Sequence, residues 1–430
     1  MPVDEGKVRN LDSGDDGEPS GRRQSNRRIR TTVRSRKKKG DETGIPGVRD
    51  VTRHVKHPVQ YMLWGLAAGR CEFDGCNKPL WKSSVTQDQV NIAEKAHIYS
   101  FSDDGPRGND GITNEQLNDL PNLMLVCPEC HAEIDKKKDG GRYTAQLLKE
   151  WKAAHERRIA IVTGIDPLMK SHVVVYGANI GAYSSPLKYA SVAPALFPGR
   201  YPAEDRAIEL GMTDSVLRDS GSAFWTMEAE NLSTKFRHRI KERLANGDVS
   251  HLSVFGLAPQ PLLMLLGTLL VDLPPVDAYQ LHREPERTWK WPDAPKVQTF
   301  ELKEPSSTAG QPVLVFSLSA TVTSDRIESV LGSDVAIWTI TIAEPNNDFT
   351  KSRTQLSEFR ALVRWTLNLI KARHGQTTTL HVFPAMSVST AIEFGRARQP
   401  KADMPWTIYD QNNALGGFVK AISLPMENDS

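Results

Sequence analysis

The chain has 430 residues, of which 39% are hydrophobic, and its 54 Lys and Arg against 52 Asp and Glu give a formal charge of +2. This length predicts two or three domains, and the hydrophobic content is sufficient for packed cores. The balanced charge excludes a strongly basic field over the whole molecule, so any affinity for nucleic acid must be local. The sequence contains no run of about twenty apolar residues and no apolar secretory segment near its start. We therefore expect a cytoplasmic protein without membrane spans.

Residues 1–45 are rich in Gly, Ser, Asp and Arg and contain the run GRRQSNRRIRTTVRSRKKKG. The segment has almost nothing to bury, so we expect a disordered basic tail. Two interpretations remain open for it: a non-specific tether for DNA phosphates, or a solvated arm without a function of its own.

Four cysteines, the only ones in the chain, lie in two close pairs. Cys71 and Cys76 have C-x4-C spacing, and Cys127 and Cys130 have C-x2-C spacing. Two such pairs can supply the tetrahedral set of four thiolates that structural zinc accepts. Disulfides would require an oxidising compartment, which nothing in the sequence indicates. The spacing predicts a structural zinc site, with disulfides, unrelated buried cysteines, or a site in which His131 replaces one thiolate as the alternatives.

Polar residues surround the cysteine pairs in a pattern that predicts strand, loop, strand and helix, a ββα unit. The expected ranges are 92–98 for the first strand, 102–114 for the loop, 123–126 for the second strand and 128–138 for the helix. The site-facing residues would be His97, Asn122 and His131. With the cysteine pairs around them, these residues over 46–165 resemble an HNH endonuclease of the zinc-containing ββα-metal type. The resemblance implies metal-dependent hydrolysis of phosphodiester bonds in DNA.

Chemistry suggests the role of each residue in this unit. A neutral imidazole near pH 7 suits removal of a proton from water, so we expect His97 to be the general base. A divalent cation such as Mg2+ would offset charge on the leaving oxygen. We expect His131 to bind it together with Asp135, four residues along the same helix face. Asn122 is expected to hold the loop to the catalytic strand through its amide.

One position departs from the family pattern. Many members carry an acidic or imidazole metal ligand just before the catalytic histidine, whereas this chain has Ala96. Glu94 lies on the same face of the predicted strand and is the candidate replacement.

Residues 166–430 alternate between predicted strands and helices, which indicates α/β units with a parallel sheet. The segments HLSVFGLAPQPLLMLLGTLL and LHVFPAMSVSTAIEFGRAR align without a gap. Val254 and Gly267 each lie 128 positions before their counterparts Val382 and Gly395. Two related halves of this kind would form a cleft beyond the carboxyl ends of their strands, where α/β sheets bind ligands.

Candidate ligand contacts follow these predicted strands. Helix N-termini and loop amides favour anions such as phosphates, and aromatic and basic side chains suit nucleobases and phosphates. Each of these side chains would alternatively pack in the core. The candidates are Asn179, Tyr183, Tyr279, His282, Arg283, Trp289, Trp291, Ser317 and Ser319.

The repeat segments, with VDAYQLHREPERTWKW and FSLSAT between them, resemble a SAVED domain, a cyclic-nucleotide sensor built from two CARF-like halves. Both domains in this order resemble the HNH-SAVED effector nucleases of bacterial CBASS anti-phage defence. The resemblance implies a DNA endonuclease activated by a cyclic di- or oligonucleotide that a partner nucleotidyltransferase makes. It also implies double-stranded DNA as substrate and a dimer or tetramer as the activated form.

Two alternatives stay open. A constitutive HNH endonuclease of the restriction type would carry a C-terminal DNA-specificity domain, but residues 166–430 show no basic stripe. A non-enzymatic, zinc-containing nucleotide sensor is the second, and the Ala96 departure keeps it open.

Overall fold

The computed structural model describes residues 54–102, 105–108, 111–136, 142–184, 187–212, 215–271, 273 and 275–425. The predicted basic tail over 1–45 lies outside these residues. None of the helices in the described ranges is both long and apolar enough to cross a membrane.

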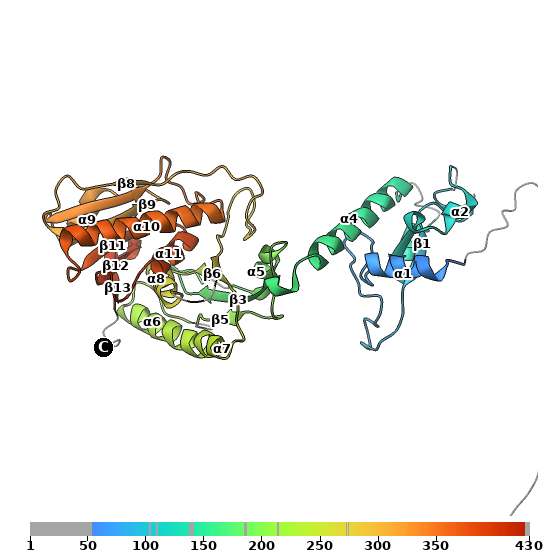
Figure 1. The fold of residues 1–430 in the computed structure, drawn as a ribbon, viewed down its shortest axis with the longest axis horizontal. Coiled ribbons are helices and arrows are strands. Elements are labelled where there is room, and N and C mark those ends of the chain that lie inside the picture. The colour runs from blue at the N-terminus through green and yellow to red at the C-terminus, as the bar shows by residue number, and fades with distance from the viewer. Residues whose placement is uncertain are drawn as a thin grey trace, which may run out of the picture. The chain divides into compact units, whose positions relative to one another are not determined.

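The cysteines lie in an N-terminal module that contains the expected strand, loop, strand and helix (Figure 1). Its elements are α1 (His57–Leu66), β1 (Glu94–His97), α2 (Asn114–Leu117), β2 (Leu123–Val126), α3 (Pro128–Ile134) and α4 (Ala145–Thr163). β1 and β2 pair antiparallel, with His97 opposite Leu123. The first strand and the helix are shorter than expected, and Asp135 is the C-cap residue of α3.

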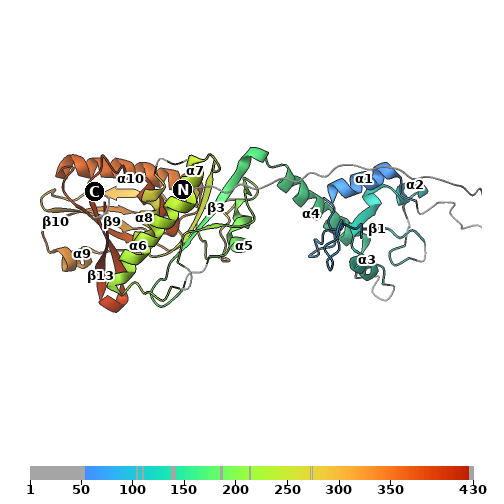
Figure 2. The same ribbon diagram turned by 90° about the horizontal axis from the view of Figure 1, so that it is seen from below.

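Burial explains why this small module holds together. All four residues of β2 are apolar and buried, because α1 contacts β2 directly and β1 pairs with it. On the other strand, α3 contacts β1, and Figure 2 shows α1, β1 and α3 gathered in this module. Phe73 and Tyr143 both pack against Trp151 of α4, with ring centroids 4.8 and 6.0 Å away, which fastens the first cysteine loop to that helix. The module therefore has a core of its own.

The C-terminal part contains two mainly parallel sheets. The first has the strand order β4-β3-β6-β7, with β5 also paired to β3. Its strands are β3 (Lys170–Gly177), β4 (Tyr201–Pro202), β5 (Ile208–Glu209), β6 (Leu252–Leu257) and β7 (Val276–Ala278). The second has the order β13-β12-β11-β9-β10-β8, in which β8 and β13 are antiparallel edges. Its strands are β8 (Glu301–Lys303), β9 (Gln311–Ser317), β10 (Val335–Thr341), β11 (Leu380–Ala385), β12 (Trp406–Asn412) and β13 (Gly417–Leu424).

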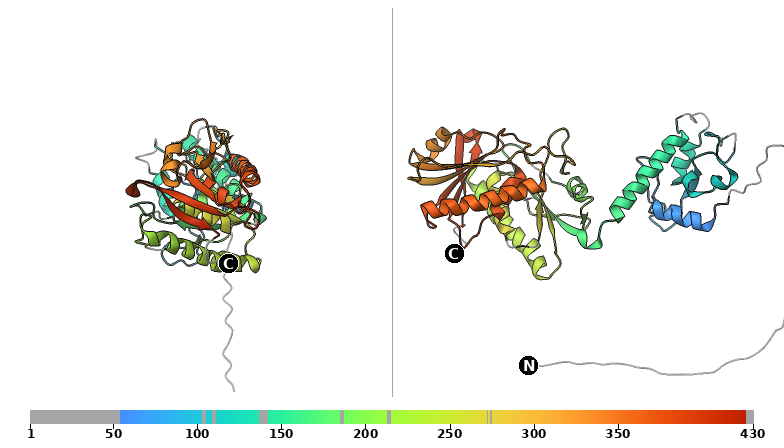
Figure 3. Two further views of the ribbon diagram at one scale, coloured as in Figure 1. Left: turned by 90° about the vertical axis from the view of Figure 1, so that its left-hand side faces the viewer. Right: turned by 45° about the horizontal axis from the view of Figure 1, so that its top comes forward.

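Helices connect and cover these strands. They are α5 (Tyr189–Val192), α6 (Ser222–Phe236), α7 (Glu242–Ala245), α8 (Gln260–Leu269), α9 (Ser324–Leu331), α10 (Arg353–His374) and α11 (Val388–Arg396), with a π-helical turn over Arg237–Lys241 between α6 and α7. The long α10 lies across the second sheet (Figure 3). Its Phe359 packs against Phe316 of β9, with ring centroids 5.9 Å apart.

The two sheets belong to related halves, as the aligned segments predicted. β6 and α8 recur as β11 and α11 at the offset of 128 positions. The two helices cross where Gly267 and Gly395 meet, and a Cβ on Gly267 would lie only 2.1 Å from the carbonyl oxygen of Ile392. A Cβ on Gly395 would lie 2.0 Å from the carbonyl oxygen of Met264. Only glycine fits such a backbone contact, so the repeated glycine marks the junction of the halves.

Candidate functional site

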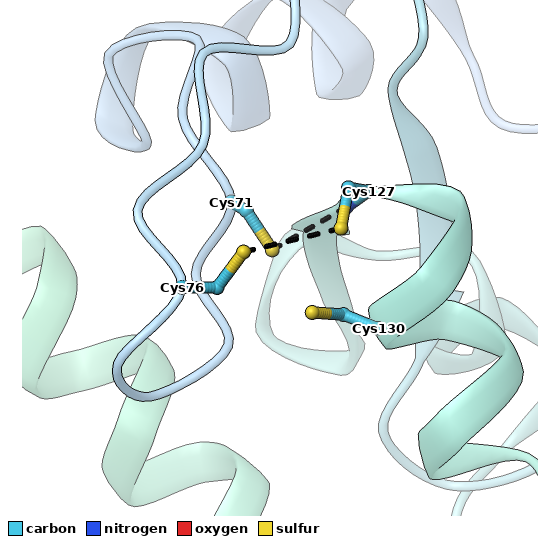
Figure 4. A group of neighbouring side chains, drawn as sticks. All are labelled: Cys71, Cys76, Cys127 and Cys130. Atoms are coloured by element: carbon cyan, nitrogen blue, oxygen red, sulfur yellow. Dashed lines mark hydrogen bonds between the residues drawn. The ribbon is translucent and has the colours of Figure 1, made fainter. Parts of the chain in front are cut away.

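The four cysteine side chains converge on one point (Figure 4). Their Sγ atoms all lie within 4.8 Å of one another, and those of Cys76 and Cys127 are 3.9 Å apart. Tetrahedral zinc with Zn–S bonds of about 2.3 Å places sulfur atoms roughly 3.8 Å apart. All four thiols are free, so none is used in a disulfide. The donor set fits a structural zinc ion.

Electrostatics point the same way. Burial raises the pKa of the Cys71 thiol to about 12, and burial also raises the pKa of Cys130, whereas at Cys76 hydrogen bonds outweigh burial and lower the pKa. Thiols in such contact would not ionise together without a cation among them, and zinc supplies that charge. His131 is not one of the four converging residues, which argues against a site of three thiolates and one imidazole.

His97 ends β1 and is half-buried. Its Nε2 atom lies 3.1 Å from Oδ1 of Asn118, the residue that caps α2 at its C-terminus. If Nε2 carries the proton and donates it to this oxygen, Nδ1 holds the lone pair that a general base needs. The sequence analysis did not identify Asn118, because it assigned no element to residues 115–122, between the predicted loop and the second predicted strand, where α2 ends.

Asn122 is 3% exposed, and both ends of its amide contact backbone. Its Oδ1 accepts a hydrogen bond of 2.7 Å from the N–H of Tyr99, and its Nδ2 donates to the carbonyl of Leu117 at 3.0 Å. These contacts join the chain just after His97 to the turn before β2. They are the contacts expected of a residue that holds the loop to the end of β1.

His131 and Asp135 lie next to each other, as the four-residue spacing predicted. Nε2 of His131 is 3.3 Å from Oδ2 of Asp135, a separation that suits two ligands of one cation at about 2.1 Å. Burial favours the neutral carboxyl, but hydrogen bonds from His131 and Arg107 prevail and lower the pKa of Asp135. The carboxylate is therefore available as an anionic ligand near neutral pH.

Glu94 approaches the other side of the same ring. Its Oε2 lies 3.9 Å from Nδ1 of His131, whereas Asp135 faces Nε2. Glu94 could share a cation with Asp135 only if the His131 ring turned. Ala96, at the position where many HNH enzymes carry a ligand, is buried. Within the described ranges, the cysteines are the one group of three or more such ligand atoms that lie together. A third ligand for the catalytic cation stays a prediction.

The candidate ligand residues of the C-terminal part fall into two groups. Several side chains are buried or occupied by protein contacts. Tyr279 is fully buried, stacks on Phe255 at 4.4 Å, and its hydroxyl accepts a hydrogen bond of 2.6 Å from Arg353. Trp289 is 5% exposed in the same core, and Asn179 donates to the carbonyls of residues 215 and 217 at 2.8 Å. These residues shape the fold around the strand ends.

The other candidates differ in exposure. Tyr183 is 80% exposed and Arg283 is also exposed, so both can reach a ligand. His282 is buried, with Nδ1 3.3 Å from Oδ1 of Asp348. Ser317 is buried and its Oγ accepts from the N–H of Val322. The backbone of the partly exposed Ser319 donates to the carbonyl of residue 385.

A buried polar seam that the sequence analysis missed joins the halves at the N-termini of α8 and α11. Oε1 of Gln280 accepts hydrogen bonds from the N–H and the hydroxyl of Ser389, at 3.2 and 2.7 Å. Oε1 of Gln260 accepts from the N–H of Met386 at 3.1 Å. The serine-rich start of α11 was the available signal, since SVST follows a strand directly. The seam places hydrogen-bonding groups where two strand ends and two helix N-termini meet.

Comparison with protein families identifies the C-terminal part. Residues 232–424 match the family described as "SMODS-associated and fused to various effectors sensor domain", SAVED. The C-terminal part is a SAVED sensor domain. The matched residues contain β6 and β7 of the first sheet, the whole second sheet and the α8–α11 junction. A comparison with curated proteins finds no match.

Solved structures give a distant likeness. A Cap4 SAVED/CARF-domain containing receptor from Acinetobacter baumannii, solved with the cyclic trinucleotide 2'3'3'-cAAA, is 12% identical with a TM-score of 0.36, and the alignment covers 67% of this chain and 61% of that one. The Moraxella osloensis Cap4 receptor is 12% identical with a TM-score of 0.33, covering 67% and 59%. The chain thus spans about three fifths of these receptors, too distant a likeness to transfer a ligand or an activity.

Proposed function

We propose that the protein is a cyclic-nucleotide-activated, metal-dependent DNA endonuclease of the HNH type, an effector of bacterial CBASS anti-phage defence. The observation that carries the proposal is the His131–Asp135 pair in the same ββα unit as His97, on the same chain as a SAVED domain. A base and a cation site within one small unit are the two groups that phosphodiester hydrolysis requires.

The chain's own residues would divide the reaction as follows. His97 would accept a proton from the attacking water, and the contact of its Nε2 with Asn118 would keep the ring oriented. His131 and Asp135 would hold a divalent cation, which when bound supplies Lewis-acid stabilisation of the leaving oxygen. Asn122 would keep the strand end and its loop in place.

The SAVED domain would supply the control. The match to the SAVED sensor family supports a cyclic di- or oligonucleotide, made by a partner nucleotidyltransferase, as the proposed ligand. The Acinetobacter baumannii Cap4 receptor, solved with two different cyclic trinucleotides, provides the first compounds to test. One HNH site cuts one strand, so cleavage of double-stranded DNA requires two sites brought together in a dimer or tetramer. A ligand that binds the assembled state more tightly would drive this assembly.

The test is plasmid cleavage by the purified full-length chain with Mg2+, alone and with a panel of cyclic di- and trinucleotides that includes 2'3'3'-cAAA and 3'3'3'-cAAA. We expect cutting with one class of ligand and none in the His97→Ala variant. Ligand-independent cutting would replace the proposal with a restriction-type nuclease. Ligand binding without cutting under any condition would replace it with a nucleotide sensor.

A further inference from the structure

Arg107 lies in the loop between β1 and α2, yet its side chain is only 3% exposed. Arginine is almost never buried unless it is paired. The loop is fixed close to the strand end, because Ser100 Oγ accepts from the N–H of Arg107 at 3.1 Å and the N–H of Ser100 donates to the carbonyl of Gly108 at 2.8 Å. A Cβ on Gly105 would lie 2.2 Å from that of Ser100, so the close approach requires glycine.

The guanidinium of Arg107 joins the two elements that carry the proposed chemistry. On the strand side it donates to the carbonyl of Ile98 at 2.6 Å and to that of His97 at 3.0 Å. On the helix side it donates to the carbonyl of Ile134 and to Oδ1 of Asp135, the latter at 2.9 Å. All three guanidinium nitrogens are used, and every partner is in or next to the site.

The geometry of these contacts matters because the site is split between two short elements. A guanidinium is planar and rigid, so its hydrogen bonds fix both distance and orientation. Its charge also lies at the C-terminus of α3, where a cation is favourable. Because Arg107 holds Oδ1 of Asp135, the other oxygen is left facing Nε2 of His131.

We propose that Arg107 is a positioning residue of the nuclease site, which sets the separation of His97 from the His131–Asp135 pair and orients the Asp135 carboxylate toward the cation. The inference rests on the proposed function. A purely electrostatic role predicts the opposite sign: removing a positive charge next to Asp135 would increase the attraction for a divalent cation. Positioning predicts weaker cation binding, because ligand orientation is lost.

The experiment measures Mn2+ affinity by calorimetry on the full-length chain carrying His97→Ala, which prevents turnover and leaves the contacted backbone carbonyl intact. We expect Arg107→Ala and Arg107→Lys each to weaken Mn2+ binding by about 10- to 100-fold, the effect typical of lost partners of metal ligands. Zinc content should not change. Arg158→Ala is the matched control, because Arg158 contacts Asn77 and His155 instead, and its Mn2+ affinity should equal that of the parent.

Two results would overturn the inference: unchanged or tighter Mn2+ binding in Arg107→Ala, or full retention of affinity in Arg107→Lys, which keeps the charge and loses the fork. If Arg107→Ala does not fold, a double-mutant cycle of Mn2+ affinity with Arg107→Lys and Asp135→Asn replaces it. Positioning through Asp135 predicts that the second substitution adds little to the first, and additive losses contradict it. If the parent chain cuts DNA only with ligand and Arg107→Lys binds Mn2+ normally, the role of Arg107 is contradicted and the proposed function stands. If Mn2+ binding depends on Arg107 but the chain never cuts DNA, the proposed ligand-activated cleavage is contradicted and the role of Arg107 stands.

Discussion

The N-terminal module and the SAVED domain are held together in different ways. The module has short strands, and side chains that bond to backbone or converge on one point hold its loops: the four cysteines, Asn122 and Arg107. The SAVED domain has a continuous apolar core across both sheets and a direct backbone contact between α8 and α11. The first region should therefore respond steeply to single polar substitutions, and the second to changes of volume and of buried charge.

The largest expected effect is the loss of zinc from the module. Cys127→Ser removes one of four converging thiolates, and structural zinc contributes on the order of 10 kcal/mol to folding of small domains. We expect the module to unfold while the SAVED domain keeps its own thermal transition. Calorimetry and metal analysis of the full-length chain would check this, and a single shared transition in the variant would contradict the independence of the two regions.

A pair of histidines sharpens the comparison next. His97→Ala should lower the rate of ligand-activated cleavage by about 10²- to 10⁴-fold, the usual contribution of a general base, and leave ligand binding unchanged. His282→Ala, which removes the buried partner of Asp348, should instead lower the melting temperature of the SAVED domain. Cleavage assays and melting curves on both variants would measure the split. A normal cleavage rate in His97→Ala would refute its role as base.

Glycines provide a matched pair with a smaller effect. Gly267→Ala forces a Cβ into the Ile392 carbonyl and should destabilise the SAVED domain by about 1–3 kcal/mol or more, as overpacking does. Gly65→Ala lies in α1 with no atom near the new Cβ and should stabilise the module by about 0.5–1 kcal/mol. Denaturant unfolding, followed separately for each region, would measure both changes in the free energy of unfolding and their opposite signs. Equal changes in the free energy of unfolding would mean that the α8–α11 contact can widen to accept a Cβ.

The last expected effect depends on pH. Burial, together with the neighbouring Asp219 carboxylate, raises the pKa of Asp410 to about 7. Between about pH 4 and 7, the folded chain therefore still holds a proton on Asp410 that the unfolded chain has already released. This group's contribution to stability is greatest below its unfolded pKa and falls as the pH rises through that range, by about 1.4 kcal/mol for each pH unit. Asp410→Asn should flatten the fall and raise the melting temperature at pH 8, and parallel curves would refute the assignment.

Sequence spacing predicted those features that depend on local order. The cysteine pairs, the ββα order and the i, i+4 pair of His131 and Asp135 are set by distance along the chain, and the 128-position repeat predicted the two halves. The role of Arg107 was not predicted, because an arginine in a loop is expected to be exposed to solvent and only the fold shows that this one is buried. Tyr279 was expected near ligand but is core, because an aromatic residue after a strand can turn to either face.

The contact between Gly267 and Gly395 has a consequence for how the SAVED domain arose. Gly267 and Gly395 are repeat equivalents, and each faces the equivalent carbonyl of the other helix, so they flank a local pseudo-twofold axis like that of a symmetric dimer. The two halves therefore meet as two copies of a single-half protein would. Fusion of such a pair would have kept the glycine in both copies, since neither helix can approach the other unless both are bare at that point.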